Sequence, residues 1–364
     1  MEEYIVVSDK SALADDAIAA VPEPAPRRRT RSGGAPTIYD IAQLAGVNPS
    51  TVSRALNQPG RINAKTEARV RAAAKELDYH ANPMARALPT GRTNTLGLFL
   101  ADITNPMVFD VVRGAERAAT AAGLTLVIAE SQESGDLEET AIERLLPSVD
   151  GVVLATTRLS DERILALTRR KPVVLMNREV DGVTSVVPDI GPGVDETVAH
   201  LHGLGHRSIV YLSGPTTSWM SGRRWDALSA SVVAHGMSLI EIGPNAPTLA
   251  GGRDAFARVQ LSGATAVVAY NDLMAIGLLR EASLRGVVFP DNLSIVGFDD
   301  IFGSDFTSPP LTTVRSPLLE AGTRAVDLVL HAITTGDQVT PCLVTGDLTT
   351  ELVVRGSTGA PQAT

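Results

Sequence analysis

The chain has 364 residues, 44% of them apolar and 20% charged, which is long enough for two or three domains that each bury a core. No apolar run approaches the ~20 residues of a membrane helix, and the acidic start lacks the pattern of a secretory signal. These features predict a cytoplasmic protein without a membrane partner. The single cysteine, Cys342, excludes an internal disulfide, and we expect it to be buried in a strand.

The net charge of −9 is unevenly distributed along the chain. Residues 37–92 carry eight basic and four acidic side chains, whereas residues 93–364 carry 19 basic and 31 acidic ones. Any contact with nucleic acid is therefore expected in the basic segment, although chance would also account for an excess of this size. Residues 1–36 are rich in Pro, Gly and Arg, which predicts a disordered tail.

The basic segment begins with a pattern of three short helices, expected at residues 38–45, 49–57 and 64–77. Thr37 is a suitable N-cap for the first helix, and Gly46 can take the left-handed conformation that ends it. Asn48 caps the second helix, and Pro49 occupies its first position.

Small and apolar residues within this segment stand at the spacing of a helix-turn-helix. Ala42 lets two helices approach, Gly46 forms the turn, and Val52 seats the second helix on the first. The second helix then presents an outward polar face, formed by Ser50, Ser53, Arg54 and Asn57. Such a face can donate hydrogen bonds to base edges and phosphates in a major groove. The alternative is a small helical bundle with a solvated face.

A further short helix is predicted directly after this segment, capped by Asn82 and opened by Pro83. Helices below ~12–15 residues are marginal in water, so this one should order only against a partner. Leu88 at its end suits an apolar wedge in a minor groove. The alternative is an inter-domain linker.

From residue 93 onward, short β-rich runs alternate with helical segments. The strands are expected at residues 95–101, 124–129, 151–156, 172–177, 208–213, 238–242, 266–271 and 293–298. This alternation predicts parallel sheets with helices on both faces, and about 270 residues of it predict two similar lobes with a cleft between them.

On these residues the chain resembles the LacI/GalR family of bacterial transcription regulators. The resemblance covers about residues 37–357 and is carried by the motifs at 37–42, 46–57, 90–97, 204–206, 213–215, 271–272, 294–300 and 310–314, together with Tyr79, Asn82-Pro83, Ala85 and Leu88. It implies an α/β fold with an N-terminal helix-turn-helix headpiece and a two-lobed, periplasmic-binding-protein-like core of doubly wound parallel sheets. The chain is expected to cross between the lobes near Val187, Val314 and Val344.

The resemblance also implies an organisation and a set of partners. The expected parts are a tail (1–36), the headpiece (37–81), a hinge helix and linker (82–92), the core (93–357) and a second tail (358–364). A homodimer would place two headpieces on pseudo-palindromic operator DNA. A small effector between the lobes, expected to be a sugar, would switch the affinity for the operator. The polar C-terminus has no leucine heptads, which favours a dimer over a tetramer.

The family's DNA contacts transfer to this sequence by position. Base-reading or specificity-setting positions are matched by Asn48, Pro49, Ser50 and Arg54, and phosphate-contacting positions by Thr37, Tyr39, Thr51, Ser53 and Asn57. Leu88 matches the intercalating leucine of the hinge helix. Pro89 departs from the basic residue that is common there, which removes a charge and an N–H group.

The effector site is implied in the same way, by Arg224, Asn271, Asp272, Asp299, Trp219 and Phe109. Arg224 suits vicinal hydroxyls or a carboxylate, and the acidic side chains would accept hydrogen bonds from sugar hydroxyls. Three of these residues also have a structural interpretation: a surface charge for Arg224, a helix N-cap for Asp272 and a packed core residue for Trp219. In the family, an Asn-Pro pair is often followed by two aromatic residues. Here Asn105-Pro106 is followed by Met107 and Val108, and the aromatic Phe109 comes only after them.

Enzymatic activity is not expected, because the sequence holds neither a phosphate-binding loop nor a His-Glu-x-x-His motif. His200, His202 and His206 do not share one helix face, so we expect no metal site and no cofactor. The sequence therefore predicts a DNA-binding regulator, expected to be a repressor. The alternatives are the same regulator with an effector that is not a sugar, or a cytoplasmic solute-binding protein without specific DNA binding.

Overall fold

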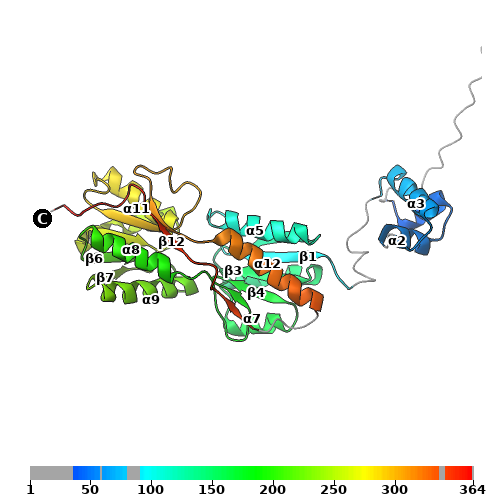
Figure 1. Ribbon diagram of the computed structural model, residues 1–364, viewed down its shortest axis with the longest axis horizontal. Coiled ribbons are helices and arrows are strands. Elements are labelled where there is room, and N and C mark those ends of the chain that lie inside the picture. Colours follow the sequence, from blue (N-terminus) through cyan, green and yellow to red (C-terminus); the bar gives the residue numbers. More distant parts are fainter. Residues whose placement is uncertain (1–35, 58–59, 80–90, 336–340, 363–364) are drawn as a thin grey trace, which may run out of the picture. The chain divides into compact units, whose positions relative to one another are not determined.

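The computed structural model describes residues 36–57, 60–79, 91–335 and 341–362. The chain divides into two compact units, Met1–Ala81 and Asn82–Thr364 (Figure 1). The predicted tail up to residue 35, and the predicted hinge helix with Leu88 and Pro89, lie outside the described residues.

The first unit contains the three predicted helices, α1 (Ile38–Ala45), α2 (Pro49–Asn57) and α3 (Ala64–Glu76). Gly46 has a φ of 62°, the left-handed conformation that lets the chain turn after α1. A small apolar core joins the helices, formed by Ile41, Ala42, Ala45, Val52, Ala55, Val70, Ala73 and Ala74. Residues 37–81 of this unit are called the headpiece below.

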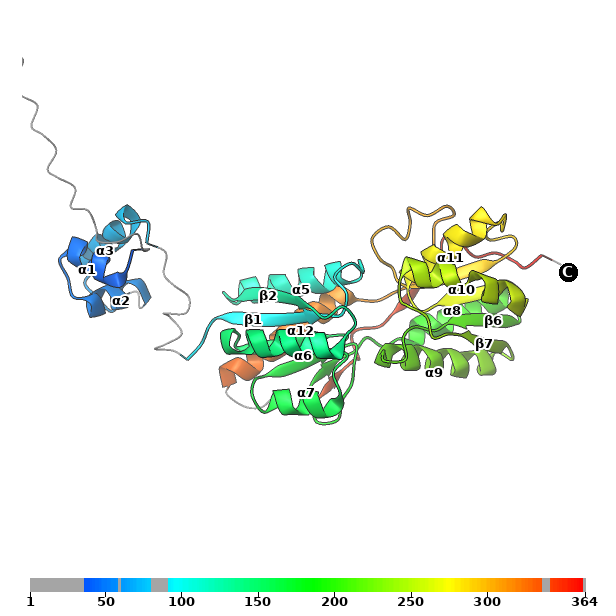
Figure 2. The same ribbon diagram turned by 180° about the vertical axis from the view of Figure 1, so that it is seen from behind.

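The second unit consists of two lobes, each built on a six-stranded sheet (Figures 1 and 2). In lobe 1 the strand order is β11-β5-β4-β3-β1-β2. These strands are β1 (Thr95–Leu100), β2 (Thr125–Glu130), β3 (Gly151–Ala155), β4 (Val173–Met176), β5 (Ser185–Val186) and β11 (Leu343–Val344). The helical elements of lobe 1 are α5 (Val108–Ala121), α6 (Gly135–Leu145), η1 (Leu146–Ser148), α7 (Asp161–Thr168) and α12 (Leu318–Thr335).

Helices cover both faces of the lobe 1 sheet, so its inner strands β1, β3 and β4 are apolar and buried on both sides. Val153 of β3 packs into a core cluster shared with α5 and α12. The neighbouring Val152 and Leu154 pack into a second cluster on the opposite face, shared with α6, η1 and α7.

Lobe 2 repeats this topology with the strand order β12-β10-β9-β8-β6-β7. Its strands are β6 (Ser208–Leu212), β7 (Ser238–Ile242), β8 (Ala266–Ala269), β9 (Ser294–Asp299), β10 (Thr312–Arg315) and β12 (Glu351–Val353), of which β12 is antiparallel to β10. Its helices are α8 (Gly191–Gly203), α9 (Trp219–Ala234), α10 (Leu249–Ser262) and α11 (Asp272–Leu284). The expected fold class is therefore confirmed.

The chain crosses between the lobes three times, after β5, after β10 and after β11. The predicted crossing points near Val187, Val314 and Val344 fall at these places. All eight predicted strands are present, with ends that differ from the prediction by two residues or fewer. The sequence reasoning missed β5, β10, β11 and β12, which have only two to four residues each and little room for a pattern.

The prediction for Cys342 is wrong, because the side chain is exposed. Cys342 lies directly before β11, a two-residue strand at the edge of the lobe 1 sheet. Only its backbone joins the sheet there, through the carbonyl that accepts the N–H of Ser185 at 2.9 Å.

The predicted end of the core at residue 357 is too early. Ser357 is fully buried and donates its hydroxyl to the carbonyl of Ile295, and Gly359 donates its N–H to Ser294. The described end of the chain thus remains fixed to lobe 2. None of the described helices is both long and apolar enough to cross a membrane.

Helices α5 and α12 approach so closely that glycine is required at their contact. A Cβ atom on Gly114 would lie 2.0 Å from the carbonyl oxygen of Leu319, and one on Gly322 would lie 2.4 Å from that of Val111. Both clashes are with backbone atoms, which cannot move aside without shifting a helix.

We therefore expect Gly114→Ala to lower the stability of lobe 1 by about 1–3 kcal/mol through overpacking. Gly222→Ala is the matched control, because Gly222 is exposed inside α9 with no atom within 4 Å of an added Cβ. That substitution should raise stability by about 0.5–1 kcal/mol through the higher helix propensity of alanine. Thermal unfolding of the full chain measures both, and equal effects of the two variants would contradict the packing argument.

Candidate functional site

The start of the headpiece is fixed by a local hydrogen-bond pair. The carboxylate of Asp40 accepts the N–H of Thr37 at 2.8 Å and its hydroxyl at 2.7 Å. These bonds lower the pKa of Asp40 below its ordinary value. Thr37 is thus the N-cap of α1, as the sequence predicts, and its hydroxyl is directed toward the first turn of the helix.

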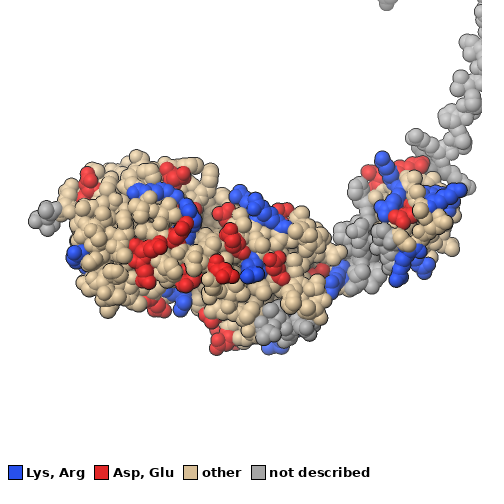
Figure 3. All heavy atoms as spheres, viewed as in Figure 1, with Lys and Arg blue, Asp and Glu red and all other residues tan. Residues whose placement is uncertain are grey.

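Helix α2 separates its residues into a buried side and an outward side. Val52 and Ala55 are fully buried, whereas Ser50 and Arg54 are exposed. Of the other residues predicted to contact DNA, Tyr39 and Asn48 are exposed, and Pro49, Thr51 and Ser53 are half-buried. Asn57 is the last residue of α2, and its side chain lies outside the described residues. Figure 3 shows lysine and arginine side chains on the face of the headpiece that is in view.

A pocket lies between the two lobes, where the carboxyl ends of their strands meet. Its walls are formed by Ala101, Asp102, Asn105, Met107, Val108, Glu133, Thr156, Arg158, Asn177, Met220, Arg224, Pro247, Tyr270, Asn271 and Asp299. Each of these residues ends a strand or lies in the loop or helix that follows one. Open parallel sheets bind their ligands at this edge, where the order of the strands reverses.

The turns that reach this pocket hold non-glycine residues in left-handed backbone conformations. The φ angles are 61° at Glu133, 59° at Thr156, 54° at Asn177 and 105° at Asp299. Such conformations cost of order 1–3 kcal/mol each and persist where the surrounding structure holds them in place. The pocket therefore has fixed walls with polar side chains at defined positions.

Lobe 2 brings a buried ion pair to the pocket. Arg224 of α9 donates from Nη2 to Asp299 Oδ1 at 2.8 Å, and its Nη1 donates to the carbonyl of Tyr270. The two side chains are only 7% and 3% exposed. Burial raises the pKa of Asp299 above its ordinary value, while Arg224 opposes that rise. The guanidinium also lies 3.7 Å from the ring centre of Phe298.

Asn271 joins this wall of the pocket, as the resemblance implies. Its Oδ1 accepts the N–H of Met274 at 2.9 Å and so caps α11, and its Nδ2 donates to the carbonyl of Pro247 at 2.9 Å. The structure thus brings Arg224, Asn271 and Asp299 together at one edge of lobe 2.

Lobe 1 contributes a second ion pair that sequence reasoning missed. Arg158 donates from Nε to Glu133 Oε2 at 2.7 Å, and its Nη1 donates to the carbonyl of Thr156 at 2.7 Å. The Arg158 side chain is 5% exposed. The positions of the two residues in the sequence could have indicated this pair, because Glu133 follows β2 and Arg158 follows β3 at the same edge of the sheet.

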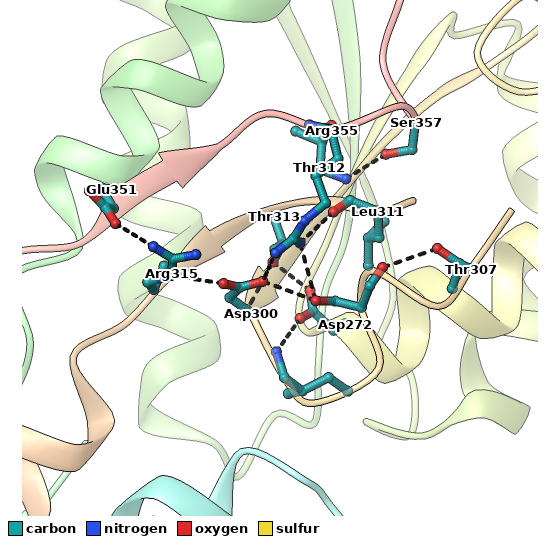
Figure 4. Close-up of polar contacts among 12 residues, drawn as sticks. Asp272, Asp300, Thr307, Leu311, Thr312, Thr313, Arg315, Glu351, Arg355 and Ser357 are labelled. Atoms are coloured by element: carbon teal, nitrogen blue, oxygen red, sulfur yellow. Dashed lines mark hydrogen bonds and ion pairs between the residues drawn. The ribbon is translucent and has the colours of Figure 1, made fainter. Parts of the chain in front are cut away.

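Asp272 does not line the pocket, although it was predicted as an effector contact. It is fully buried, and its carboxylate accepts the hydroxyl of Thr313 at 2.5 Å and the N–H of Ile301 at 2.8 Å (Figure 4). The side chain turns inward because β9 has glycine beside it: a Cβ on Gly297 would lie 1.9 Å from Asp272 Oδ1. The carboxyl group therefore links α11 to β10 and to the turn after β9.

The adjacent Asp300 lies in a different charge environment. Arg315 and Arg355 donate to its carboxylate at 2.8 and 2.6 Å (Figure 4). Although burial acts in the other direction, these bonds and that of Ser304 hold the pKa of Asp300 below its ordinary value. Asp300 is therefore a structural ion-pair partner at the base of the turn.

The two predicted aromatic contacts also lie outside the pocket lining. Trp219 is half-buried against the lobe 2 core, with the guanidinium of Arg223 5.4 Å from its ring centre. Phe109 is 48% exposed on α5. Trp219 thus takes the packing role that was its alternative interpretation.

The three histidines have separate surroundings. His206 contacts Thr265 at 2.7 Å, His200 contacts Thr358 at 2.9 Å, and His202 packs on the ring of His235. Among the described residues, no group of three or more His, Cys, Asp or Glu is placed to hold a metal ion.

A helix-turn-helix headpiece in one chain with two parallel-sheet lobes and a pocket between them is the architecture of a transcriptional regulator with a ligand-binding core. Comparison with known families agrees. The profile of bacterial regulatory proteins of the lacI family matches residues 37–82, and that of the periplasmic binding protein-like domain matches residues 198–358. The HTH-type transcriptional regulator GalR of Escherichia coli (strain K12) is 33% identical over 304 residues, which cover 81% of this chain and 88% of that protein.

Two solved structures extend the likeness. The Lac repressor dimer bound to operator and the anti-inducer ONPF has a TM-score of 0.81 at 26% identity, covering 90% of this chain and all of that one. A LacI family transcriptional regulator from Enterococcus faecium with bound ribose has a TM-score of 0.65 at 25% identity, covering 73% and 99%. This chain belongs to the LacI family of bacterial regulatory proteins.

The buried Asp272 predicts a specific pH dependence of stability. Burial raises the pKa of Asp272 well above its ordinary value of 3.8, and the nearby Asp299 and Asp300 raise it further. The folded state therefore favours the protonated carboxyl, so its contribution to stability is lost as the pH rises from about 4 through the raised pKa.

We expect Asp272→Asn, which carries no charge to bury, to raise the melting temperature relative to wild type at pH 8 by about 2 °C or more and to have a smaller effect near pH 5. Asp254→Asn on the surface of α10 is the control and should change the melting temperature equally at both values. A difference between wild type and Asp272→Asn that stays constant with pH would contradict the argument.

Proposed function

We propose that this protein is a ligand-controlled transcriptional repressor that binds operator DNA through α2 and an effector between its lobes. The observation that carries the proposal is the outward polar side of α2, with Ser50 and Arg54 exposed over a buried Val52 and Ala55. An exposed arginine on a recognition helix can donate two hydrogen bonds to guanine.

The DNA contacts are proposed residue by residue. Asn48, Pro49, Ser50 and Arg54 set base preference, and Thr37, Tyr39, Thr51, Ser53 and Asn57 hold the phosphates. Leu88 enters the minor groove from the hinge segment. Phosphate contacts fix the register of the helix, and base contacts supply specificity.

The headpiece (37–81) and hinge segment (82–92) act in pairs. The similar Lac repressor binds its operator as a dimer, and a homodimer of this chain would present two α2 helices to a pseudo-palindromic site. A repressor acts where the chromosome lies, so the location proposed for this protein is the cytoplasm.

The effector is proposed to be a sugar bound in the pocket by Arg224, Asn271 and Asp299 of lobe 2. The ribose-bound relative supports this class of ligand. For the sugar to act as a switch, it must bind the two arrangements of the lobes with different affinities. The chain crosses between the lobes at three places, so a change in the arrangement of the lobes is transmitted to the segments that connect them. We propose no catalytic role for the pocket, in keeping with relatives that are regulators.

Arg54→Ala tests the proposal. The full-length wild type should enrich a pseudo-palindrome from a random duplex pool, and Arg54→Ala should bind that sequence about tenfold or more weakly, because one bidentate base contact is worth about 1–3 kcal/mol. Lys75→Ala on the exposed side of α3 removes the same charge and should affect all sequences alike. Fluorescence anisotropy across salt concentrations measures both.

Failure of the wild type to enrich any sequence would overturn the proposal and favour a solute-binding protein without specific DNA contact. Equal losses for Arg54→Ala and Lys75→Ala would reduce the role of α2 to phosphate attraction.

A further inference from the structure

Each lobe contributes the same kind of group to the pocket, an arginine side chain paired with a carboxylate. Lobe 1 presents Arg158 with Glu133 at 2.6 Å, and lobe 2 presents Arg224 with Asp299 at 2.8 Å. Each pair is formed within its own lobe, by residues that end or follow different strands at the carboxyl edge. The pocket therefore has a guanidinium–carboxylate pair on each side.

This arrangement leaves the pocket without surplus positive charge. Among the described lining residues, the bases are Arg158 and Arg224, and the acids are Asp102, Glu133 and Asp299. A phosphate or carboxylate on a ligand would have to displace a carboxylate already bound to its arginine or lie beside it. Sugar hydroxyls meet no such conflict, because each can donate to a carboxylate and accept from a guanidinium.

At two of the helix N-termini beside the pocket, a backbone N–H is already bound by a pocket asparagine, whereas at α9 the N-cap Ser218 makes no side-chain cap hydrogen bond. Helix starts bind phosphate through backbone N–H groups that have no partner in the helix. Here Asn271 Oδ1 accepts the N–H of Met274 at the start of α11, and Asn105 Oδ1 accepts the N–H of Met107 directly before α5 at 3.2 Å. Both asparagines are themselves pocket residues.

Among its described lining residues, the pocket offers no open aromatic face for a nucleobase. Tyr270 is the aromatic side chain among the described lining residues, and it is 9% exposed. Backbone covers its ring at Gly214, where an added Cβ would lie 2.7–2.9 Å from ring atoms. The guanidinium of Arg224 lies 4.9 Å from the ring centre. Stacking on a base requires a free ring face.

We propose that the effector is an uncharged, unphosphorylated monosaccharide, and that the Glu133–Arg158 pair is a specificity-determining contact that excludes phosphorylated sugars. This inference rests on the proposed function, because it specifies the ligand of the same pocket. Glu133 accepts ligand hydroxyls while it neutralises Arg158, so one side chain both binds the neutral sugar and rejects the anionic one.

The first test uses the full-length wild type in isothermal titration. The probes are the common aldohexoses, aldopentoses and ketohexoses, their terminal phosphate esters, and the ribonucleosides. We expect one or a few neutral monosaccharides to bind and the matching phosphate ester to bind at least about tenfold more weakly. Preferential binding of a sugar phosphate or of a nucleoside would overturn the proposal, and so would the absence of any binding across the panel.

The second test substitutes the lobe 1 carboxylate. Glu133→Gln keeps the shape of the side chain but leaves Arg158 without its counter-charge. The variant should bind the neutral sugar about tenfold more weakly and the phosphate ester more tightly than the wild type does. Glu139→Gln is the matched control, because Glu139 pairs with Arg163 at 3.3 Å on the exposed side of lobe 1. That variant should bind both ligands as the wild type does.

The two readouts separate failure of this inference from failure of the proposed function. Unchanged discrimination in Glu133→Gln, with a melting temperature near that of the wild type, would remove Glu133 from recognition while leaving the regulator intact. Operator enrichment by the wild type is measured without any sugar, so it stands or falls independently of the titrations. Loss of fold in Glu133→Gln leaves the wild-type panel as the deciding measurement.

Discussion

The cost of burying charge governs the arrangement of the pocket. An unpaired ion taken out of water loses several kcal/mol of solvation, so a buried arginine must carry its own counter-ion. Arg224 meets this requirement with Asp299, and Arg158 meets it with Glu133. Because each pair lies within one lobe, the lobes can move relative to each other without separating a buried charge from its partner. The carboxylates remain close enough to the pocket to accept further hydrogen bonds.

Those pairs depend in turn on the strained turns at the carboxyl edges of the sheets. Asp299 ends β9 with a φ of 105°, and Asp300 follows with a φ of 51°. Two successive residues in this region send adjacent carboxylates to different partners, Asp299 to Arg224 and Asp300 to Arg315. The buried carboxyl of Asp272 accepts the N–H of Ile301 at the end of the same turn. The buried Asp272 therefore stabilises the turn whose backbone directs the side chains of Asp299 and Asp300 to their arginine partners.

Sequence reasoning succeeded where the signal was local. Caps, a turn glycine and helical spacing fixed the headpiece, and apolar runs located the long strands. It failed where side-chain direction depended on a distant residue. Asp272 follows a strand, as a pocket residue should, but the space left by Gly297 turns it inward. The Glu133–Arg158 pair was missed because the two residues are 25 positions apart and meet only when β2 and β3 lie in one sheet.

The arginines of the headpiece and those of the pocket lie in opposite environments. This difference separates DNA binding from effector binding. Arg54 is exposed on α2, in a segment with a net charge of +4, where a polyanion can reach it. Arg158 and Arg224 are buried and neutralised inside a core whose sequence is net acidic. These two arginines therefore offer no site for DNA phosphates. The net negative charge of the core repels DNA, so the headpiece binds the operator and the pocket binds the effector.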